Sequence, residues 1–159
     1  MDLDGFDRQL LNLLQQDSAP TAERLAEKVP LSPSAIQRRV KRLKDEGYIL
    51  TEVAVVDPKK VGRPTFFVVS LEIERERPEL LASLRAWLAA QDEVQQAYYV
   101  TGAADFVLVL TAPDAEAYDA FMNRLVAENP NVRRFTTNVA LGVVKRSLAV
   151  PVRSIGADG

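Results

Sequence analysis

A basic cluster between Leu31 and Lys44 carries the clearest chemical signal in this chain. The cluster holds five cations and no carboxylate, although the whole protein of 159 residues has a net charge of −2. The cations are Arg38, Arg39, Lys41, Arg42 and Lys44. Guanidinium and ammonium groups neutralise phosphates, and serine, glutamine and arginine can hydrogen-bond to base edges in a major groove. These residue types therefore indicate contact with nucleic acid.

A short helix is predicted to position this cluster. Ser32 can act as its N-cap, and Pro33 suits the first helical position. Leu31 can pack on Ile36 across the cap. Gly47 is well placed to end the helix in a left-handed conformation.

The two sides of this predicted helix differ in chemistry. Ile36, Val40 and Leu43 form one apolar stripe, which would anchor the helix in a small core. The opposite side is polar and is free to enter a major groove, which is wide enough for one helix. The predicted DNA contacts are Ser32, Ser34, Gln37, Arg38, Arg39, Lys41 and Arg42. Because a basic run by itself also fits a solvated surface, the flanking elements must decide between the two interpretations.

Two further helices are predicted before the basic one. The first runs to about Gln16 with Asp2 or Asp4 as its cap, and Thr21 can cap the second. Their inward residues are Leu3, Phe6, Leu10, Leu13 and Leu14 in the first helix, and Leu25, Ala26 and Val29 in the second. A strand is predicted from Tyr48 to Val56. Three helices with a tight second turn and a following strand indicate a winged helix-turn-helix, with the basic helix as its recognition helix.

The rest of the chain predicts a second domain. Residues 57–64 contain two prolines and a glycine and are read as a linker. We therefore predict a DNA-binding domain over residues 1–56, a second domain over 65–150, and a tail over 151–159.

The pattern of the second domain is β-α-β-β-α-β. Strands are predicted over residues 65–74, 94–100, 106–111 and 132–144, with helices beginning at Pro78 and after Asp114. This order predicts a ferredoxin-like α+β fold, with both helices on one face of a four-stranded antiparallel sheet. Phe66 and Val68 would lie on the uncovered face. An apolar open face predicts sheet-to-sheet pairing in a homodimer, which would supply two recognition helices.

The composition excludes several function classes. The chain has no histidine and no cysteine. A zinc site, a Ser-His-Asp triad and a Cys-His pair are therefore not expected, and any enzyme would have to rely on Asp, Glu, Lys, Arg, Tyr or Ser. We predict no metal, no cofactor and no enzymatic activity. There is no apolar run long enough to span a membrane, and the amphipathic N-terminus does not look like a signal peptide, so we expect a cytoplasmic protein.

A family resemblance accompanies this reading. The first domain carries Leu3-Asp4-x-x-Asp7-x-x-Leu10-Leu11-x-x-Leu14, then Leu25-Ala26, then Leu31-Ser32-x-x-x-Ile36-x-x-Arg39-Val40-x-x-Leu43-x-x-x-Gly47-x-Ile49. This spacing resembles the leucine-responsive/asparagine regulator (Lrp/AsnC) family. The resemblance continues to about residue 150, and it implies a transcriptional regulator that responds to an amino acid.

The resemblance also implies an effector site in the second domain. The matching residues are Val100-Thr101-Gly102-x-x-Asp105-Phe106 and Thr136-Thr137. Carried over, the effector-binding residues are Gly102, Ala103, Ala104, Asp105, Thr136, Thr137 and Asn138. A carboxylate can hold an α-ammonium, while loop N–H groups and hydroxyls can hold an α-carboxylate. Gly102 and Asp105 could instead serve only to form a hairpin turn.

The leading hypothesis is a sequence-specific regulator whose assembly or affinity for double-stranded DNA responds to an amino acid or related metabolite. Homodimers would assemble into higher oligomers, for which tetramers, octamers and open helices are the alternatives. One alternative is an architectural DNA-binding protein without an effector. Another is an enzyme similar to the sirohaem decarboxylases, which the absence of histidine disfavours.

Overall fold

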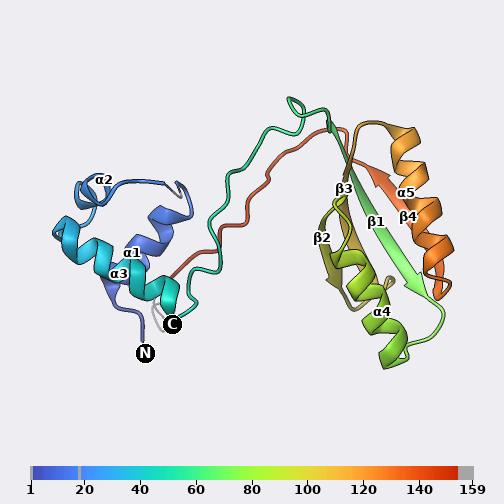
Figure 1. Ribbon diagram of the computed structural model, residues 1–159, viewed down its shortest axis with the longest axis horizontal. Coiled ribbons are helices and arrows are strands. Elements are labelled where there is room, and N and C mark those ends of the chain that lie inside the picture. Colours follow the sequence, from blue (N-terminus) through green and yellow to red (C-terminus); the bar gives the residue numbers. More distant parts are fainter. Residues whose placement is uncertain (1, 18, 154–159) are drawn as a thin grey trace. The chain divides into compact units, whose positions relative to one another are not determined.

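The chain forms two compact units in a computed structural model that describes residues 2–17 and 19–153. The first unit contains residues 1–55 together with the segment from Lys145 onward, and the second is Val56–Val144 (Figure 1). The predicted tail began at residue 151, whereas the structure returns the chain to the first unit from Lys145. Residues 154–159 of that tail lie outside the described residues.

The first unit contains the three predicted helices, α1 (Gly5–Leu14), α2 (Ala22–Ala26) and α3 (Pro33–Asp45). Each begins after a side-chain cap. Asp4 and Asp7 form a capping box on α1, and the hydroxyls of Thr21 and Ser32 accept hydrogen bonds from backbone N–H groups of α2 and α3. These local signals fix where the helices start.

A small apolar core joins the three helices. Its most buried members are Leu10, Leu25, Val29, Ile36 and Leu43, which come from α1, α3 and the segment around α2. The apolar stripes predicted from helical spacing therefore do face inward. Their burial sets the orientation of α3, whose other side remains exposed.

The strand predicted over residues 48–56 is not formed. Gly47 does end α3 with a φ of 77°, as its position predicts. Beyond it, Leu50, Val53 and Val55 are exposed. A strand requires a paired neighbouring strand, and no strand in the described part of the chain pairs with this segment. The helix-turn-helix is therefore present here without a wing strand.

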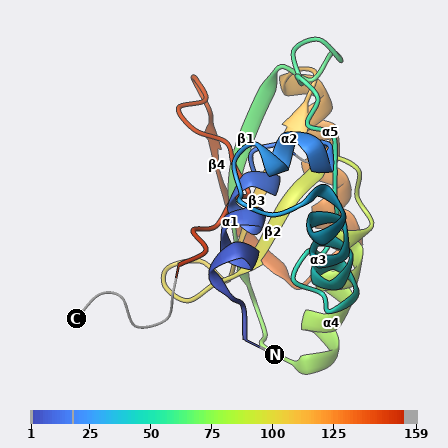
Figure 2. The ribbon, with the colours of Figure 1, turned by 90° about the vertical axis from the view of Figure 1, so that its left-hand side faces the viewer.

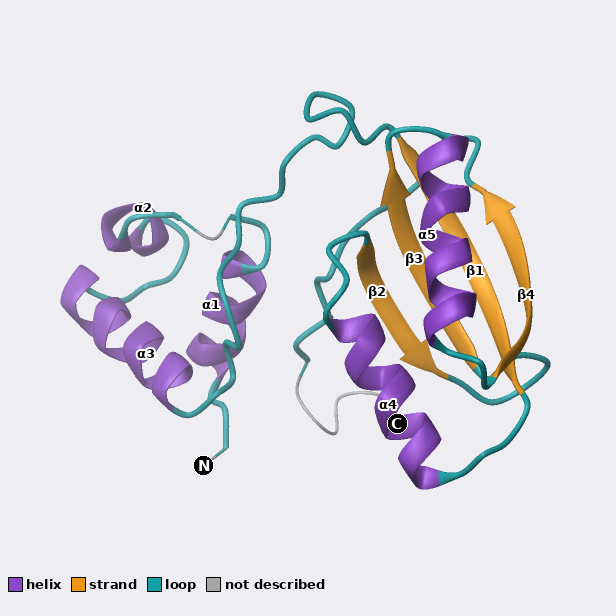
Figure 3. Cartoon of the chain, turned by 45° about the vertical axis from the view of Figure 1, so that its right-hand side comes forward, coloured by secondary structure: helices purple, strands orange, loops and turns teal. Residues whose placement is uncertain are grey.

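The second unit has the predicted β-α-β-β-α-β order. Its elements are β1 (Thr65–Ile73), α4 (Pro78–Ala89), β2 (Val94–Tyr99), β3 (Phe106–Ala112), α5 (Ala115–Glu128) and β4 (Val132–Val139). The sheet is antiparallel with strand order β2-β3-β1-β4. Both helices cover the same face (Figure 3). This arrangement confirms the predicted α+β, ferredoxin-like fold.

The register of β1 separates the two faces of the sheet. Its alternate residues Phe67, Val69 and Leu71 lie in the core beneath α4 and α5. Phe66 and Val68 project from the opposite face, which no helix covers (Figure 3). β4 ends at Val139, so the predicted continuation to residue 144 is wrong: the Ala140 N–H still donates to the Phe66 carbonyl, and no pairing with β1 follows among residues 141–144.

None of the helices in the described residues is both long and apolar enough to cross a membrane.

Candidate nucleic-acid interface

The exposed side of α3 carries most of the side chains predicted to contact DNA. Ser34, Gln37, Arg38 and Lys41 are exposed on it. Ser32 is exposed at its start, where its hydroxyl accepts the Ala35 N–H and lies 3.2 Å from the Ser34 hydroxyl. Because the apolar stripe of α3 is buried, the polar and basic side of the helix faces outward.

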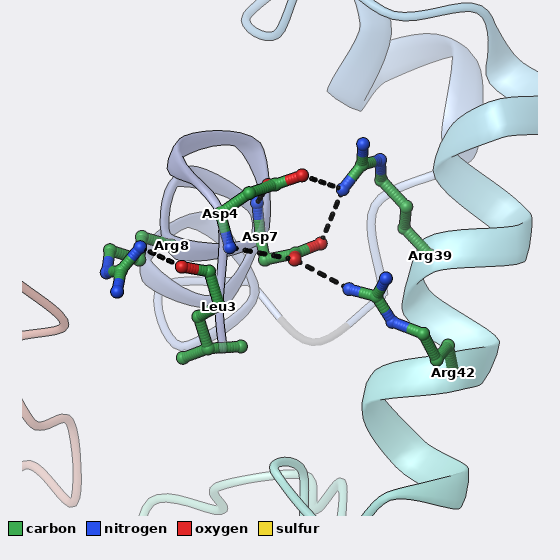
Figure 4. A network of polar contacts seen from close by, with 6 residues as sticks. All are labelled: Leu3, Asp4, Asp7, Arg8, Arg39 and Arg42. Carbon is green, nitrogen blue, oxygen red and sulfur yellow. Dashed lines mark hydrogen bonds and ion pairs between the residues drawn. The ribbon is translucent and has the colours of Figure 1, made fainter. Parts of the chain in front are cut away.

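Two of the predicted contacts, Arg39 and Arg42, instead reach back to α1. Arg39 places one guanidinium nitrogen 2.8 Å from an Asp7 carboxylate oxygen and 2.6 Å from Asp4. Arg42 lies 2.6 Å from the other oxygen of Asp7. The Asp7 side chain is 1% exposed, whereas those of Arg39 and Arg42 are 23% and 32% exposed. Figure 4 shows the carboxylates of α1 meeting both guanidinium groups of α3.

The electrostatics of this cluster favour the charged forms of Asp4 and Arg39. The backbone N–H of Asp7 and the guanidinium of Arg39 hold the pKa of Asp4 below its ordinary value. Hydrogen bonds to Asp4 and Asp7 raise the pKa of Arg39. Two carboxylates therefore neutralise two of the five cations, and the ion pairs hold α3 against α1.

The remaining cations of α3 differ in whether they already form an ion pair. Lys41 pairs with Asp45 one turn further along α3, and Lys44 lies 2.7 Å from Glu52. These exposed pairs are weak and can exchange for a phosphate. Arg38 makes no hydrogen bond or ion pair among the described residues. Arg38 is thus the cation of α3 that needs to break no existing interaction before it contacts a ligand.

Asp7 is a buried partner of the basic helix that the sequence pattern did not predict. A signal was available, because Asp7 stands three residues after the capping Asp4 and next to the apolar stripe of α1. A carboxylate bordering an apolar stripe is expected to have a buried cationic partner. The spacing of residues in the sequence does not indicate which cations of α3 pair with Asp7.

The loop predicted to bind an effector is a tight hairpin connection between β2 and β3. Gly102 adopts a φ of 118°. The Asp105 carboxylate accepts a hydrogen bond of 2.8 Å from the Ile73 N–H, and the Asp105 N–H donates to the Leu71 carbonyl. Asp105 therefore ties the hairpin to the end of β1, and one oxygen of its carboxylate is engaged in that role.

The other predicted effector residues lie on β4, across β1 from that hairpin. Thr136 and Asn138 pair with Ser70 and Val68 and share their uncovered face of the sheet. Thr137 points to the helix-covered face, where its hydroxyl bonds to that of Tyr118. Within one chain the predicted residues are thus divided between two sides of β1 and do not line one pocket.

A shallow pocket of about 130 Å³ lies elsewhere in the second unit, lined by Arg63, Glu93, Thr111 and Tyr118 among others. Arg63 already donates to the Thr111 carbonyl at 3.1 Å. Burial raises the pKa of Tyr118. No cluster of carboxylates among the described residues could hold a metal ion.

Comparisons with known proteins match both units to the same family. The family model for the AsnC-type helix-turn-helix domain matches residues 3–44, and that for the Lrp/AsnC ligand binding domain matches residues 67–150. The chain is 44% identical over 152 residues to the HTH-type transcriptional regulator y4tD of Sinorhizobium fredii, covering 96% of this chain and 90% of that one.

Solved structures lead to the same family. An AsnC family transcriptional regulator from Agrobacterium tumefaciens has a TM-score of 0.89 at 32% identity, covering 94% of this chain and 97% of that one. A transcriptional regulator from Neisseria meningitidis, solved as a complex with L-Met, has a TM-score of 0.88 at 26% identity with the same coverage. With an AsnC-type helix-turn-helix followed by a ligand-binding domain, this chain belongs to the Lrp/AsnC family of transcriptional regulators.

Proposed function

We propose that this regulator binds its operator as a homodimer, inserts α3 into the major groove, and changes its DNA affinity or assembly when an amino acid binds the second unit. It acts where the DNA is, in the cytoplasm, and has no enzymatic activity. The observation that carries the proposal is the division of α3 into a buried apolar side and an exposed side bearing Gln37, Arg38 and Lys41.

Within this proposal the residues of α3 have different roles. Arg38 and Lys41 neutralise phosphates, and Ser34, Gln37 and Arg38 are the candidates for base edges. Arg39 and Arg42 act mainly by holding α3 against Asp7, because contact with DNA would require them to leave a nearly buried carboxylate. Ser32 acts through its cap and its exposed hydroxyl.

The DNA-binding proposal is tested by charge reversal on α3. Arg38→Glu with Lys41→Glu should abolish the gel shift of a DNA fragment selected from a random pool, since two attractive phosphate contacts become repulsive. Arg77→Glu, at an exposed position in the second unit, is the control and should bind normally. Unchanged affinity of the double variant at about 0.15 M salt would contradict the proposed role of α3.

The effector proposal is tested at Asp105. Its asparagine variant keeps an oxygen that can accept the Ile73 N–H but loses the charge that would hold an α-ammonium. L-methionine and the other amino acids are screened by thermal shift, because a ligand specific for the native state raises the melting temperature. The L-Met complex of the Neisseria relative makes L-methionine the first probe.

We expect Asp105→Asn to keep its melting temperature without ligand and to lose the ligand-induced rise. Asp92→Asn, an exposed change in the same unit, should respond as the wild type does. A full response from Asp105→Asn would restrict this residue to its role in the hairpin.

A further inference from the structure

One side of α1 contacts neither the core nor α3. Arg8, Asn12 and Gln15 follow one another at spacings of four and three residues, which places them on one side of the helix. The apolar stripe of α1 and Asp7 occupy the other sides. Three long polar side chains in a row are usually solvated, but here they have partners.

Those partners are backbone groups of the C-terminal segment, residues 149–153. The Gln15 amide donates to the Val150 carbonyl at 2.9 Å and accepts from the Val150 N–H at 2.7 Å. The Asn12 amide does the same for Val152, at 3.0 and 3.1 Å. The Arg8 guanidinium donates to the Arg153 carbonyl at 3.3 Å. Figures 1 and 2 both show this end of the described chain returning to α1.

The recognition is of backbone in an extended conformation. In an extended chain, alternate residues point their N–H and C=O groups to the same side, and the two bonded residues are two apart. Pro151 lies between them and has no N–H to donate. Each amide uses both its donor and its acceptor, as backbone groups do in a β ladder. This side of α1 therefore binds an extended peptide through the backbone of the peptide, and the side chains of the peptide take no part in these hydrogen bonds.

We propose that the Arg8–Asn12–Gln15 side of α1 is a docking site for the protein's own C-terminal segment, which serves as a second tether of the DNA-binding unit. The first tether is the chain that connects α3 to β1. The second leads from β4, through residues 140–149, to α1. Because α1 also holds Arg39 and Arg42 of α3, this tether links the strand with Thr136–Asn138 to the recognition helix. Its regulatory meaning rests on the function proposed above.

The absence of cysteine from this chain permits a direct test of the docking. Gln15→Cys combined with Val150→Cys should be joined by a short bismaleimide cross-linker, because the Gln15 side chain reaches the Val150 backbone and a linker spans the length of that side chain. The product should run as a single chain on denaturing gels. Gln9→Cys with Val150→Cys, which uses an exposed position on a different side of α1, is the control and should not cross-link efficiently.

Two outcomes would overturn the docking proposal. A cross-link that appears only as a covalent dimer would mean that the segment docks on a second copy of the chain. A yield no higher than that of the control would mean that the segment does not occupy this side of α1 in solution.

Hydrogen exchange tests whether the amides hold the segment. Asn12→Asp with Gln15→Glu removes both amide donors and places carboxylates beside the Val150 and Val152 carbonyls. We expect exchange at the Val150 and Val152 amides to rise by about tenfold. Gln9→Glu with Gln16→Glu makes an equal change of charge at exposed positions in and directly after α1. This control should leave exchange at the Val150 and Val152 amides unchanged. Equal protection in both double variants would contradict the proposal.

The regulatory role has a separate readout. With L-methionine as the probe, the Asn12→Asp, Gln15→Glu variant should bind selected DNA in the absence of ligand, and its affinity should change with ligand several-fold less than that of the wild type. An undiminished change would show that the tether carries no regulation. Absence of DNA binding by the wild type would contradict the proposed function instead, while the cross-linking result would still decide the docking.

Discussion

At the scale of single residues, Asp7 determines how much of the charge on α3 is free. Its carboxylate is nearly buried and accepts from two arginines and from the backbone N–H of Asp4. A buried carboxylate is tolerated only when such partners replace its hydration. The cluster therefore removes Arg39 and Arg42 from the exposed basic surface, while Arg38 has no hydrogen bond or ion pair to any other residue that the structure describes.

Asp7→Asn should destabilise the first unit by about 2 kcal/mol. Breaking a buried pair typically costs about 3–5 kcal/mol, and partial exposure of Arg39 and Arg42 reduces that value. Urea unfolding followed by hydrogen exchange in α1 and α3 measures the loss. Fluorescence of Trp87, the single tryptophan and a residue of the second unit, should be unaffected.

Asp45→Asn is the control for that prediction. It removes the exposed pair with Lys41, which is worth no more than about 0.5 kcal/mol. Equal losses in the two variants would contradict the importance assigned to burial of Asp7.

The Asp4 carboxylate should make the stability of the first unit depend on pH. Its pKa is lowered in the folded state, so its contribution is present above the unfolded value of about 3.9 and is lost as the pH falls through the folded value. Asn can still cap α1, so Asp4→Asn removes mainly the charge. The wild type should exceed this variant in stability at about pH 6, and the difference should narrow toward about pH 3. A difference that is constant with pH would contradict this explanation.

At the scale of elements, α3 owes its bounds to its caps and its orientation to its apolar stripe. Ser32 begins it, and Gly47 ends it with a left-handed φ of 77°. Nothing lies within 4 Å of the position that a Cβ on Gly47 would take, so a substitution there meets backbone strain and no steric contact.

Gly47→Ala should therefore destabilise the first unit by about 1 kcal/mol. Gly5→Ala is a matched control, since its added Cβ also meets open space and its φ is not left-handed. It should be neutral or slightly stabilising, because alanine favours helix. Circular dichroism during urea unfolding measures both. Equal effects would mean that the left-handed conformation carries no cost.

At the scale of the whole molecule, the uncovered face of the sheet predicts how two chains combine. Phe66, Val68 and Val109 lie on that face, opposite the one that α4 and α5 cover; Phe66 is already buried within the chain, and Val68 and Val109 are half-buried. Apolar faces of this kind are usually buried against a partner. A two-fold pairing through them would give the regulator two recognition helices.

Val109→Glu should shift the protein from dimer to monomer in sedimentation velocity, since a carboxylate would be buried without a partner. Val126→Glu, the same substitution at an exposed position of α5, should remain dimeric. A Val109→Glu variant that sediments as the wild type does would place the interface elsewhere.

Helices were predicted more accurately than strands for a physical reason. Caps at Asp4, Thr21 and Ser32 act within one turn, so the sequence nearby contains the whole signal. The segments 48–56 and 141–144 have apolar residues suited to strands, but no strand among the described residues pairs with them. Strand formation depends on a partner that is distant in sequence or belongs to another molecule.

By itself, the sequence determined the capped helices, the apolar stripes, the β-α-β-β-α-β order and the concentration of cations on α3, since each follows from neighbours a few residues apart. Only the tertiary structure decided which cations are free, because Asp7 and Arg39 are 32 residues apart and meet through packing. It likewise decided that Asp105 bonds to Ile73. It also decided that the C-terminal segment docks on α1, where Val150 meets Gln15 across a sequence separation of 135 residues. Contacts at such separations depend on the folded core, and no local pattern encodes them.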